Sequence, residues 1–280
     1  MPWHAQLDLH YIHAPVADAT RTVARYAHQG PLRILQSHYP EGPGVCHNTL
    51  VHPPGGLVGG DTLDLTVRVD QEAHGLITTP GATRFYRSEG APALQRTRIQ
   101  MAPNSRLEWL PLETIAYNGC LAENRLQLDL GPGAECLGWD VTALGLPHAQ
   151  LPFEQGQLLQ HIELEGTWLE RGLVAAHDTR LLNSPLGLAG QRCTASLFLA
   201  CGSALTRERR EFAIELAMQA IQAHELREWA GVTAPNDQVV VVRALAPQVE
   251  PAMHLLRQVW ANWRHALWHL RAEAPRIWAM

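Results

Sequence analysis

The sequence predicts a mainly β protein made of stacked β-layers, similar to a β-helix, with two α-helices near the C-terminus. Short runs of alternating apolar and polar residues fill residues 1–204, and this period of two is typical of half-buried strands. A strand–turn–strand unit recurs in the same region, which indicates stacked layers. After residue 205 the pattern changes to the period of amphipathic helices.

The recurring unit consists of an alternating strand, a short turn, a small residue and a second strand. Its copies begin at Val67, Ile99 and Leu128, so the starts lie 32 and then 29 residues apart. A unit of this size cannot bury its apolar face alone, whereas stacked neighbours share a continuous core. Because alternating hairpins also recur in β-sandwiches, three imperfect copies leave that architecture open.

The alternation defines the strands of the N-terminal part. Gly30-Pro31 and Gly131-Pro132-Gly133 are examples of the turns that separate them. We expect strands over residues 3–13, 22–26, 32–37, 61–69, 75–79, 94–101, 106–110, 125–130, 134–141, 157–165, 167–175 and 192–200.

The C-terminal part reads as helix, strand, helix. A first helix is expected over 206–229, with Gly231 closing it, and a second over 247–270. Four consecutive valines between them indicate a buried strand over 238–245. We treat 1–280 as a single domain, with a stacked β core over 1–204 and the helix–strand–helix part over 205–280. The apolar positions of the first helix include Phe212, Leu216, Ile221 and Leu226. Those of the second include the tryptophans Trp260, Trp263 and Trp268, and we assign these tryptophans to the core.

Composition excludes several classes of protein. A net charge of −5 makes nucleic acid an improbable partner, and no apolar run approaches the ~20 residues of a membrane helix. We expect a cytoplasmic protein, because no secretory signal precedes the first strand and the five cysteines form no disulfide pattern. Charged residues make up 18% of the chain, below the usual share of about 25%, which leaves room for wide apolar surfaces that fit large partners.

Two specialised loops flank the strand over 63–69. The segment over 52–61 contains two prolines and four glycines before Asp61, so a rigid, unusual turn is expected there. The segment over 78–88 is a polar loop with hydroxyl, arginine and aromatic side chains. Loops of this kind at the ends of a strand suggest a functional site or an interface.

Familiar catalytic motifs do not explain these loops. The glycine-rich run lacks the Gly-Lys-Ser/Thr ending of a phosphate loop and precedes a strand instead of a helix. No Gly-x-Ser-x-Gly elbow is present. Cys46 and His47 are adjacent and would face opposite sides of a strand, so we assign Cys46 to packing and His47 to a surface or interface.

Carboxylates next to strand ends and turns leave two interpretations open. They are polar side chains on the outer faces of strands, or they are oxygen ligands or acid–base groups, as in a carboxylate-dependent hydrolase. Carboxylates and histidines without a closed ligand cluster also suit transient contact with a borderline metal such as nickel. The carboxylates in question are Asp61, Glu108, Glu113, Asp140 and Asp178.

Several motifs resemble those of the UreD (UreH) family of urease accessory proteins, in the family's order and over roughly residues 35 to 280. The two long segments over 52–61 (HPPGGLVGGD) and 78–88 (TTPGATRFYRS) are the specific ones. Shorter matches are Tyr39-Pro40-Glu41-Gly42-Pro43, Leu107-Glu108-Trp109-Leu110-Pro111, Leu137-Gly138-Trp139-Asp140 and Pro275-Arg276-Ile277-Trp278-Ala279.

The resemblance implies a non-enzymatic chaperone of urease maturation with a stacked β fold and two C-terminal helices. It implies a scaffold that binds nickel-free urease and UreF, which in turn docks the GTPase UreG. It also implies an internal tunnel that conducts Ni²⁺ in transit, with no tightly bound cofactor. A carboxylate-dependent hydrolase and a pure docking adaptor are the alternatives.

By position, the resemblance assigns tunnel residues to this chain. Asp61, Asp140 and Asp178 are expected to be carboxylates that ligate nickel briefly. Neutral wall residues are expected at Thr79, Thr83 and Ser88. Three positions depart from the family pattern: Arg84 replaces a lysine, Ala143 replaces a cysteine, and Asn118-Gly119-Cys120 replaces Asp-Gly-Ala.

Overall fold

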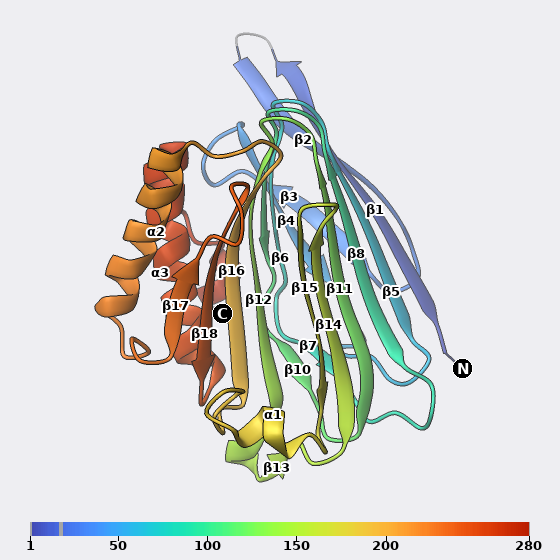
Figure 1. The fold of residues 1–280 in the computed structure, drawn as a ribbon. Coiled ribbons are helices and arrows are strands. Elements are labelled where there is room, and N and C mark those ends of the chain that lie inside the picture. Colours follow the sequence, from blue (N-terminus) through green and yellow to red (C-terminus); the bar gives the residue numbers. More distant parts are fainter. Residues whose placement is uncertain (1, 17–18, 280) are drawn as a thin grey trace.

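Two β-sheets packed face to face form the body of the molecule, and two helices cover the outer side of one of them (Figure 1). The computed structural model describes residues 2–16 and 19–279. The first sheet has the spatial order β15 (Trp168–Ala175), β14 (Gly156–Leu164), β11 (Cys120–Leu130), β8 (Ala93–Met101), β5 (Thr62–Val69), β1 (His4–Val16) and β2 (Ala19–Gln29). The second has the order β17 (Ala230–Thr233), β18 (Val239–Ala246), β16 (Cys193–Cys201), β12 (Glu135–Leu146), β9 (Arg106–Leu110), β6 (His74–Thr78), β4 (Val45–Val51) and β3 (Arg33–His38).

Three α-helices and three short strands complete the described part of the fold. The helices are α1 (Thr179–Asn183), α2 (Arg207–Gln222) and α3 (Val249–Trp268). The short strands β7 (Thr83–Phe85), β10 (Thr114–Ala116) and β13 (Leu151–Pro152) join the second sheet at one end. Of these elements the sequence predicted only α2 and α3, because strands and helices of two to five residues carry no measurable period.

The repeated units stack as a β-solenoid, which confirms the predicted fold class. In the first sheet Thr62 pairs with Leu94 and Ala93 with Ala122, both in parallel strands. These registers are offsets of 32 and 29 residues, the same as the sequence spacing. The pairs β6–β9 and β9–β12 of the second sheet repeat both offsets. Each unit therefore lays one strand on each sheet, and the next unit follows in register.

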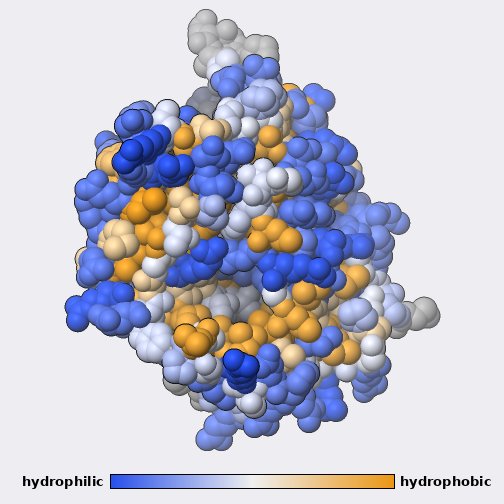
Figure 2. Space-filling model, in the orientation of Figure 1, coloured by the Kyte–Doolittle hydropathy of each residue, from blue (hydrophilic) through white to orange (hydrophobic). Residues whose placement is uncertain are grey.

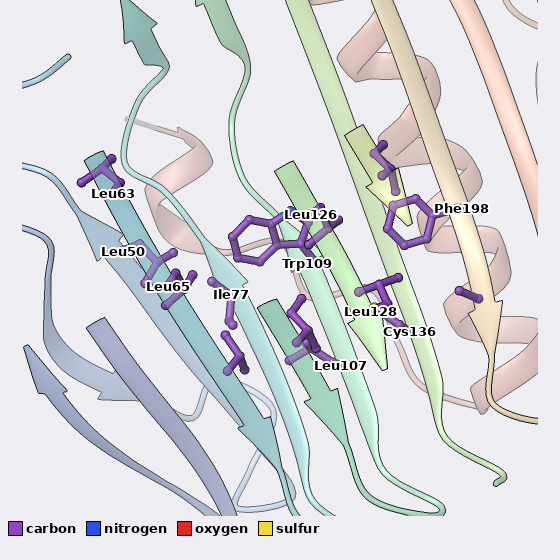
Figure 3. Packing of buried hydrophobic residues seen from close by; sticks show 14 of the residues in the cluster. Leu50, Leu63, Leu65, Ile77, Leu107, Trp109, Leu126, Leu128, Cys136 and Phe198 are labelled. Atoms are coloured by element: carbon purple, nitrogen blue, oxygen red, sulfur yellow. The ribbon is translucent and has the colours of Figure 1, made fainter. Parts of the chain in front are cut away.

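Apolar residues from both sheets fill the space between them (Figure 3). Alternation along β5 buries Leu63 and Leu65, while Thr66 on the same strand is partly exposed. Trp109 and Phe198, from the second sheet, are also buried in this core. All five cysteines are buried and carry free thiols, as the sequence predicted.

A second core lies between the second sheet and the helices. Trp260, Trp263 and Trp268 are at most 3% exposed, which confirms their assignment to the core. None of the helices in residues 2–16 and 19–279 is long and apolar enough to cross a membrane.

The first C-terminal helix is shorter than predicted. It ends at Gln222 instead of at residue 229, because the His224 ring accepts the backbone N–H of Leu226 at 3.1 Å and the chain then enters β17, which pairs with β18. The predicted face was also partly wrong, since Phe212 is exposed. Small residues let α2 approach the sheet closely, and its buried face is Ala213, Ala217, Ala220 and Ile221.

Charged residues are buried beneath α3, where the sequence indicated ordinary strand surfaces. Glu108 is fully buried and bonds to His74 and to Arg264 of α3. Arg264 also pairs with Glu41, and Glu41 pairs with His47 at 2.6 Å. His47 was assigned to a surface or interface. Its side chain is instead buried, where its ring hydrogen-bonds to the carboxylate of Glu41.

Gly156 fixes the turn that starts β14, and replacing it tests the stacking. Its φ is +97°, and an added Cβ would collide with the backbone carbonyl of Cys120 on the neighbouring strand. We expect Gly156→Ala to lower the free energy of unfolding by about 1–3 kcal/mol or more. Neither the positive φ nor the collision with the Cys120 backbone can be relieved by a local shift. Chemical denaturation measures this loss. Gly231→Ala is the control because its Cβ would meet nothing within 4 Å, and equal effects would contradict the register.

Candidate functional site

A cavity of about 240 Å³ lies between the two sheets, beneath the two loops that the sequence singled out. Part of its apolar wall is formed by Leu50, Leu63, Leu65 and Trp109, which are labelled in Figure 3. Its polar wall consists of His52, Thr79, Thr83, Gln95, Arg84, Arg96 and Thr97. The segment over 80–84 also lines it and includes exposed residues, so the cavity reaches the surface there.

A smaller space of about 20 Å³ continues the cavity deeper between the sheets. Thr83, Gln95 and Trp109 line both spaces. The smaller one adds Asn124 and Asp140. The smaller space therefore brings a carboxylate to the end of the cavity that lies away from the loops.

A chain of hydrogen bonds, here called the polar row, runs along these residues. Thr83 Oγ1 donates to Gln95 Oε1 at 3.5 Å, and Gln95 Nε2 donates to Asn124 Oδ1 at 3.2 Å. Asn124 Nδ2 then donates to Asp140 Oδ2 at 3.1 Å, and Thr142 Oγ1 donates to Asp140 Oδ1 at 3.0 Å. The row starts on β7 of the second sheet, crosses to Gln95 and Asn124 of the first sheet, and returns to a carboxylate on β12 of the second.

Strand register brings the members of the row together. Gln95 and Asn124 are direct neighbours across the β8–β11 pair. Thr114 lies between Thr83 and Thr142 across the parallel strands β7, β10 and β12. Because the units stack in register, one polar position in each unit produces a continuous line of polar side chains.

Asp140 has an environment suited to a cation. Burial is the main reason that its pKa rises from 3.8 to about 6, and the nearby charge of Glu170 also raises it. Hydrogen bonds from Thr142, Gln160 and Asn124 act in the opposite direction. At neutral pH the carboxylate is ionised although its surroundings disfavour the negative charge. A cation that reached it would compensate that charge.

Asp61 lies outside the polar row. It is 2% exposed, and its two carboxylate oxygens accept the backbone N–H groups of Trp3 at 3.2 Å and Val58 at 3.0 Å. These bonds hold the glycine-rich turn against the first strand. A nickel-binding role for Asp61 stays a prediction, and Asp61→Ala would be expected to disturb the turn as well.

The other predicted residues divide into two groups. Thr79 and Thr83 line the cavity, and Asp140 lies in the continuing space. Asp178 is instead the exposed N-cap of α1 and accepts the N–H of Leu181 at 2.9 Å. Ser88 donates to the carbonyl of Ala91. The tunnel roles of Asp178 and Ser88 stay predictions that this geometry does not link to the polar row.

Sequence reasoning missed Gln95 and Asn124. A signal for both was present, because Gln95 shares the strand face of Ile99 and Asn124 shares that of Leu128, and a polar residue on the apolar face of a strand is unusual. No group of three or more histidine, cysteine or acidic side chains placed to hold a metal occurs in residues 2–16 and 19–279. The row instead offers one carboxylate with amide and hydroxyl oxygens, which are weak ligands for a passing divalent cation.

Comparison with known proteins identifies the family to which this chain belongs. The family described as "UreD urease accessory protein" matches residues 4–279. The chain is 63% identical over 280 residues to the urease accessory protein UreD of Albidiferax ferrireducens and 64% identical over 280 residues to that of Verminephrobacter eiseniae. Identity to the UreD protein of Paracidovorax citrulli is 62% over 280 residues, and each match covers 100% of both chains. The chain therefore belongs to the UreD urease accessory protein family.

Proposed function

We propose that this chain is a cytoplasmic chaperone of urease maturation that conducts Ni²⁺ along the polar row to nickel-free urease. It is an accessory protein and not an enzyme. It binds nickel-free urease on one surface and UreF on another, and UreG reaches it through UreF. The observation that carries the proposal is Asp140, a partly buried carboxylate that ends a line of hydrogen-bonded polar side chains between the two sheets.

The geometry favours brief over permanent binding of the ion. Gln95 and Asn124 present amide oxygens, and Thr83 and Thr142 present hydroxyl groups. Thr83, Gln95 and Asn124 are linked in sequence by hydrogen bonds, and Thr142 donates to Asp140. An ion that enters would break some of these hydrogen bonds and use the freed oxygens as weak ligands. When the ion moves on, the hydrogen bonds form again. A path of several weak sites conducts better than one deep trap.

The hydrolase alternative lacks a second catalytic group. Asp140 is the single carboxylate among the described residues that line these two cavities, whereas glycoside hydrolysis and related chemistry need a facing pair. The adaptor alternative shares the docking surfaces of our proposal and differs only in the route of nickel.

Exposed apolar side chains support the docking part of the proposal. Figure 2 shows apolar residues gathered over the helical side of this face and across its lower half. Surfaces of this kind mark sites of protein association. The large exposed apolar residues include Leu151, Leu169, Leu173, Leu186, Phe212, Met218 and Trp229.

Co-purification with nickel-free urease, with and without UreF, tests the proposal. Urease activity is then measured after addition of nickel, GTP and UreG. We expect a stable complex that activates urease. Absence of any complex would favour the hydrolase alternative, and a complex that activates urease regardless of Asp140 would favour the adaptor.

A bulky residue at Thr83 should obstruct the row where the two spaces meet. Thr83→Phe places a ring between Gln95 and Trp109. Forcing this ring aside costs about 1–3 kcal/mol, so activation should slow by about tenfold or more while the complex still forms. Thr66→Phe is the matched control on the outer face of β5. Equal rates for the two variants would contradict a route past Thr83.

The amount of nickel retained by the chain should depend on pH, with a midpoint near the pKa of Asp140. Its pKa of about 6 lies above the ordinary 3.8, so the carboxylate loses its charge as the pH falls through 6. Below that point nickel bound should fall by about tenfold per pH unit, because only the ionised form is a ligand. Equilibrium dialysis from pH 5 to pH 8 measures this. Retention that does not change across pH 6 would exclude Asp140 as a ligand.

A further inference from the structure

The polar row leads to the side of the molecule where β15, the edge strand of the first sheet, lies opposite β18, which is next to the edge strand β17 of the second sheet. In the first sheet, Gln160 is the register neighbour of Asn124, and Gly172 is the neighbour of Gln160. In the second sheet, Ser196 is the neighbour of Asp140, and Arg243 is the neighbour of Ser196. Both lines therefore run from the row to this edge, away from the loops.

An ion pair bridges the sheets at that edge. Arg243 Nε donates to Glu170 Oε1 at 2.9 Å, and Arg243 Nη2 donates to Glu170 Oε2 at 2.8 Å. Arg243 Nη1 also donates to Thr233 Oγ1 at 3.0 Å. Glu170 shares its strand face with the core residues Trp168 and Val174, so the pair lies between the sheets.

The pair faces solvent on one side and the row on the other. The side chains of Arg243 and Glu170 are 43% and 34% exposed, yet the Glu170 charge raises the pKa of Asp140. A half-exposed ion pair adds little to stability in water. The contribution of this bidentate bridge to folding is therefore small. Arg243 can exchange Glu170 for water at small cost.

The β15 side of this edge carries no side chain next to Gln160. Gly172 contributes no side chain, and a Cβ added to it would meet nothing within 4 Å. Gln160 Oε1 is buried and has no hydrogen-bond partner among the described residues. A buried acceptor oxygen of this kind is costly when it is empty and would be satisfied by a cation or its water.

We propose that Arg243 and Glu170 form a gate that closes the β15–β18 end of the polar row to divalent cations. In the closed state the guanidinium repels a cation at the edge and occupies the Glu170 carboxylate. When Arg243 turns toward solvent, Glu170 is free to attract a cation from Asp140. The gate rests on the function proposed above and adds to it the place where the ion leaves or enters.

Nickel exchange tests the gate directly. The full-length chain is equilibrated with NiSO₄, and the rate at which a soluble chelator removes the nickel is followed by absorbance. Arg243→Met keeps the length of the side chain and removes its charge. We expect release about tenfold faster or more, because a cationic barrier at contact distance is lost, with the midpoint of thermal unfolding unchanged. Arg207→Met is the control, because Arg207 forms an exposed ion pair with Glu211 on α2.

The outcomes separate the gate from the proposed function. Asp140-dependent nickel in the wild-type chain with unchanged release from Arg243→Met would overturn the gate and leave the route intact. Faster release from Arg243→Met that is absent from Arg207→Met would support the gate. Nickel binding that is the same in Asp140→Asn as in the wild type would overturn the route and the gate together.

Discussion

Replacing Glu108 by alanine is expected to lower the free energy of unfolding by about 3–5 kcal/mol, the cost of breaking a buried ion pair. Glu108 accepts hydrogen bonds from Trp260 Nε1 at 2.7 Å and Arg264 Nε at 3.1 Å, and pairs with His74 Nε2 at 2.8 Å. The variant leaves Arg264 fully buried with one carboxylate fewer. Because Glu41 still pairs with Arg264, a value near the lower end is expected.

Urea denaturation measures this loss, and Glu211→Ala is the control. Glu211 pairs with Arg207 on the exposed side of α2, where loss of an ion pair costs at most about 1 kcal/mol. A loss of that size in Glu108→Ala would contradict the role of the buried pair. The double variant Glu108→Met with Arg264→Met should recover only part of the stability, because it removes the unpaired guanidinium but leaves Glu41 without Arg264 and Trp260 without Glu108.

Acid should weaken the wild type more than the Glu108→Ala variant. Burial raises the pKa of Glu108, but the hydrogen bond and charge of His74 and the charge of Arg264 outweigh it and hold the pKa below 4.5. A lowered folded-state pKa adds stability above pH 4.5 that is lost as the pH falls through the folded-state value. The two denaturation curves should therefore approach each other toward low pH.

Replacing Asp140 by asparagine is expected to slow nickel-dependent activation of urease by about ten- to a hundredfold, the range seen when groups that support a metal are removed. The amide keeps the shape of the carboxylate and can retain its bonds to Asn124 and Thr142. The free energy of unfolding at pH 7 should be unchanged or higher, since the charged form of Asp140 is disfavoured by burial.

Asp178→Asn is the matched comparison for this experiment. Asparagine is as good an N-cap as aspartate, so α1 should be unaffected. If Asp178→Asn slows activation and Asp140→Asn does not, the polar row is the wrong route and the role predicted for Asp178 from the family resemblance is favoured. The pair of variants therefore distinguishes an interior route from one over α1.

The sequence determined the stacked β fold through features that act locally. The spacing of Val67, Ile99 and Leu128 predicted stacked units, and the strand registers repeat that spacing because stacked units align their turns. Alternation gave the buried face of β5, and the tryptophans of α3 gave the helix side that packs on the sheet. The resemblance to UreD proteins added the family, which the comparisons confirm.

Tertiary structure alone decided which polar residues meet. Asp61 and Asp140 look alike in sequence, but one caps a turn and the other ends the polar row. The buried position of Glu108 depends on Arg264, which lies 156 residues later in the chain. Neither placement follows from local periodicity, because a carboxylate becomes buried only where distant donors compensate the loss of water. Long-range pairing also ended α2 early, since β18 offered the following residues a strand partner.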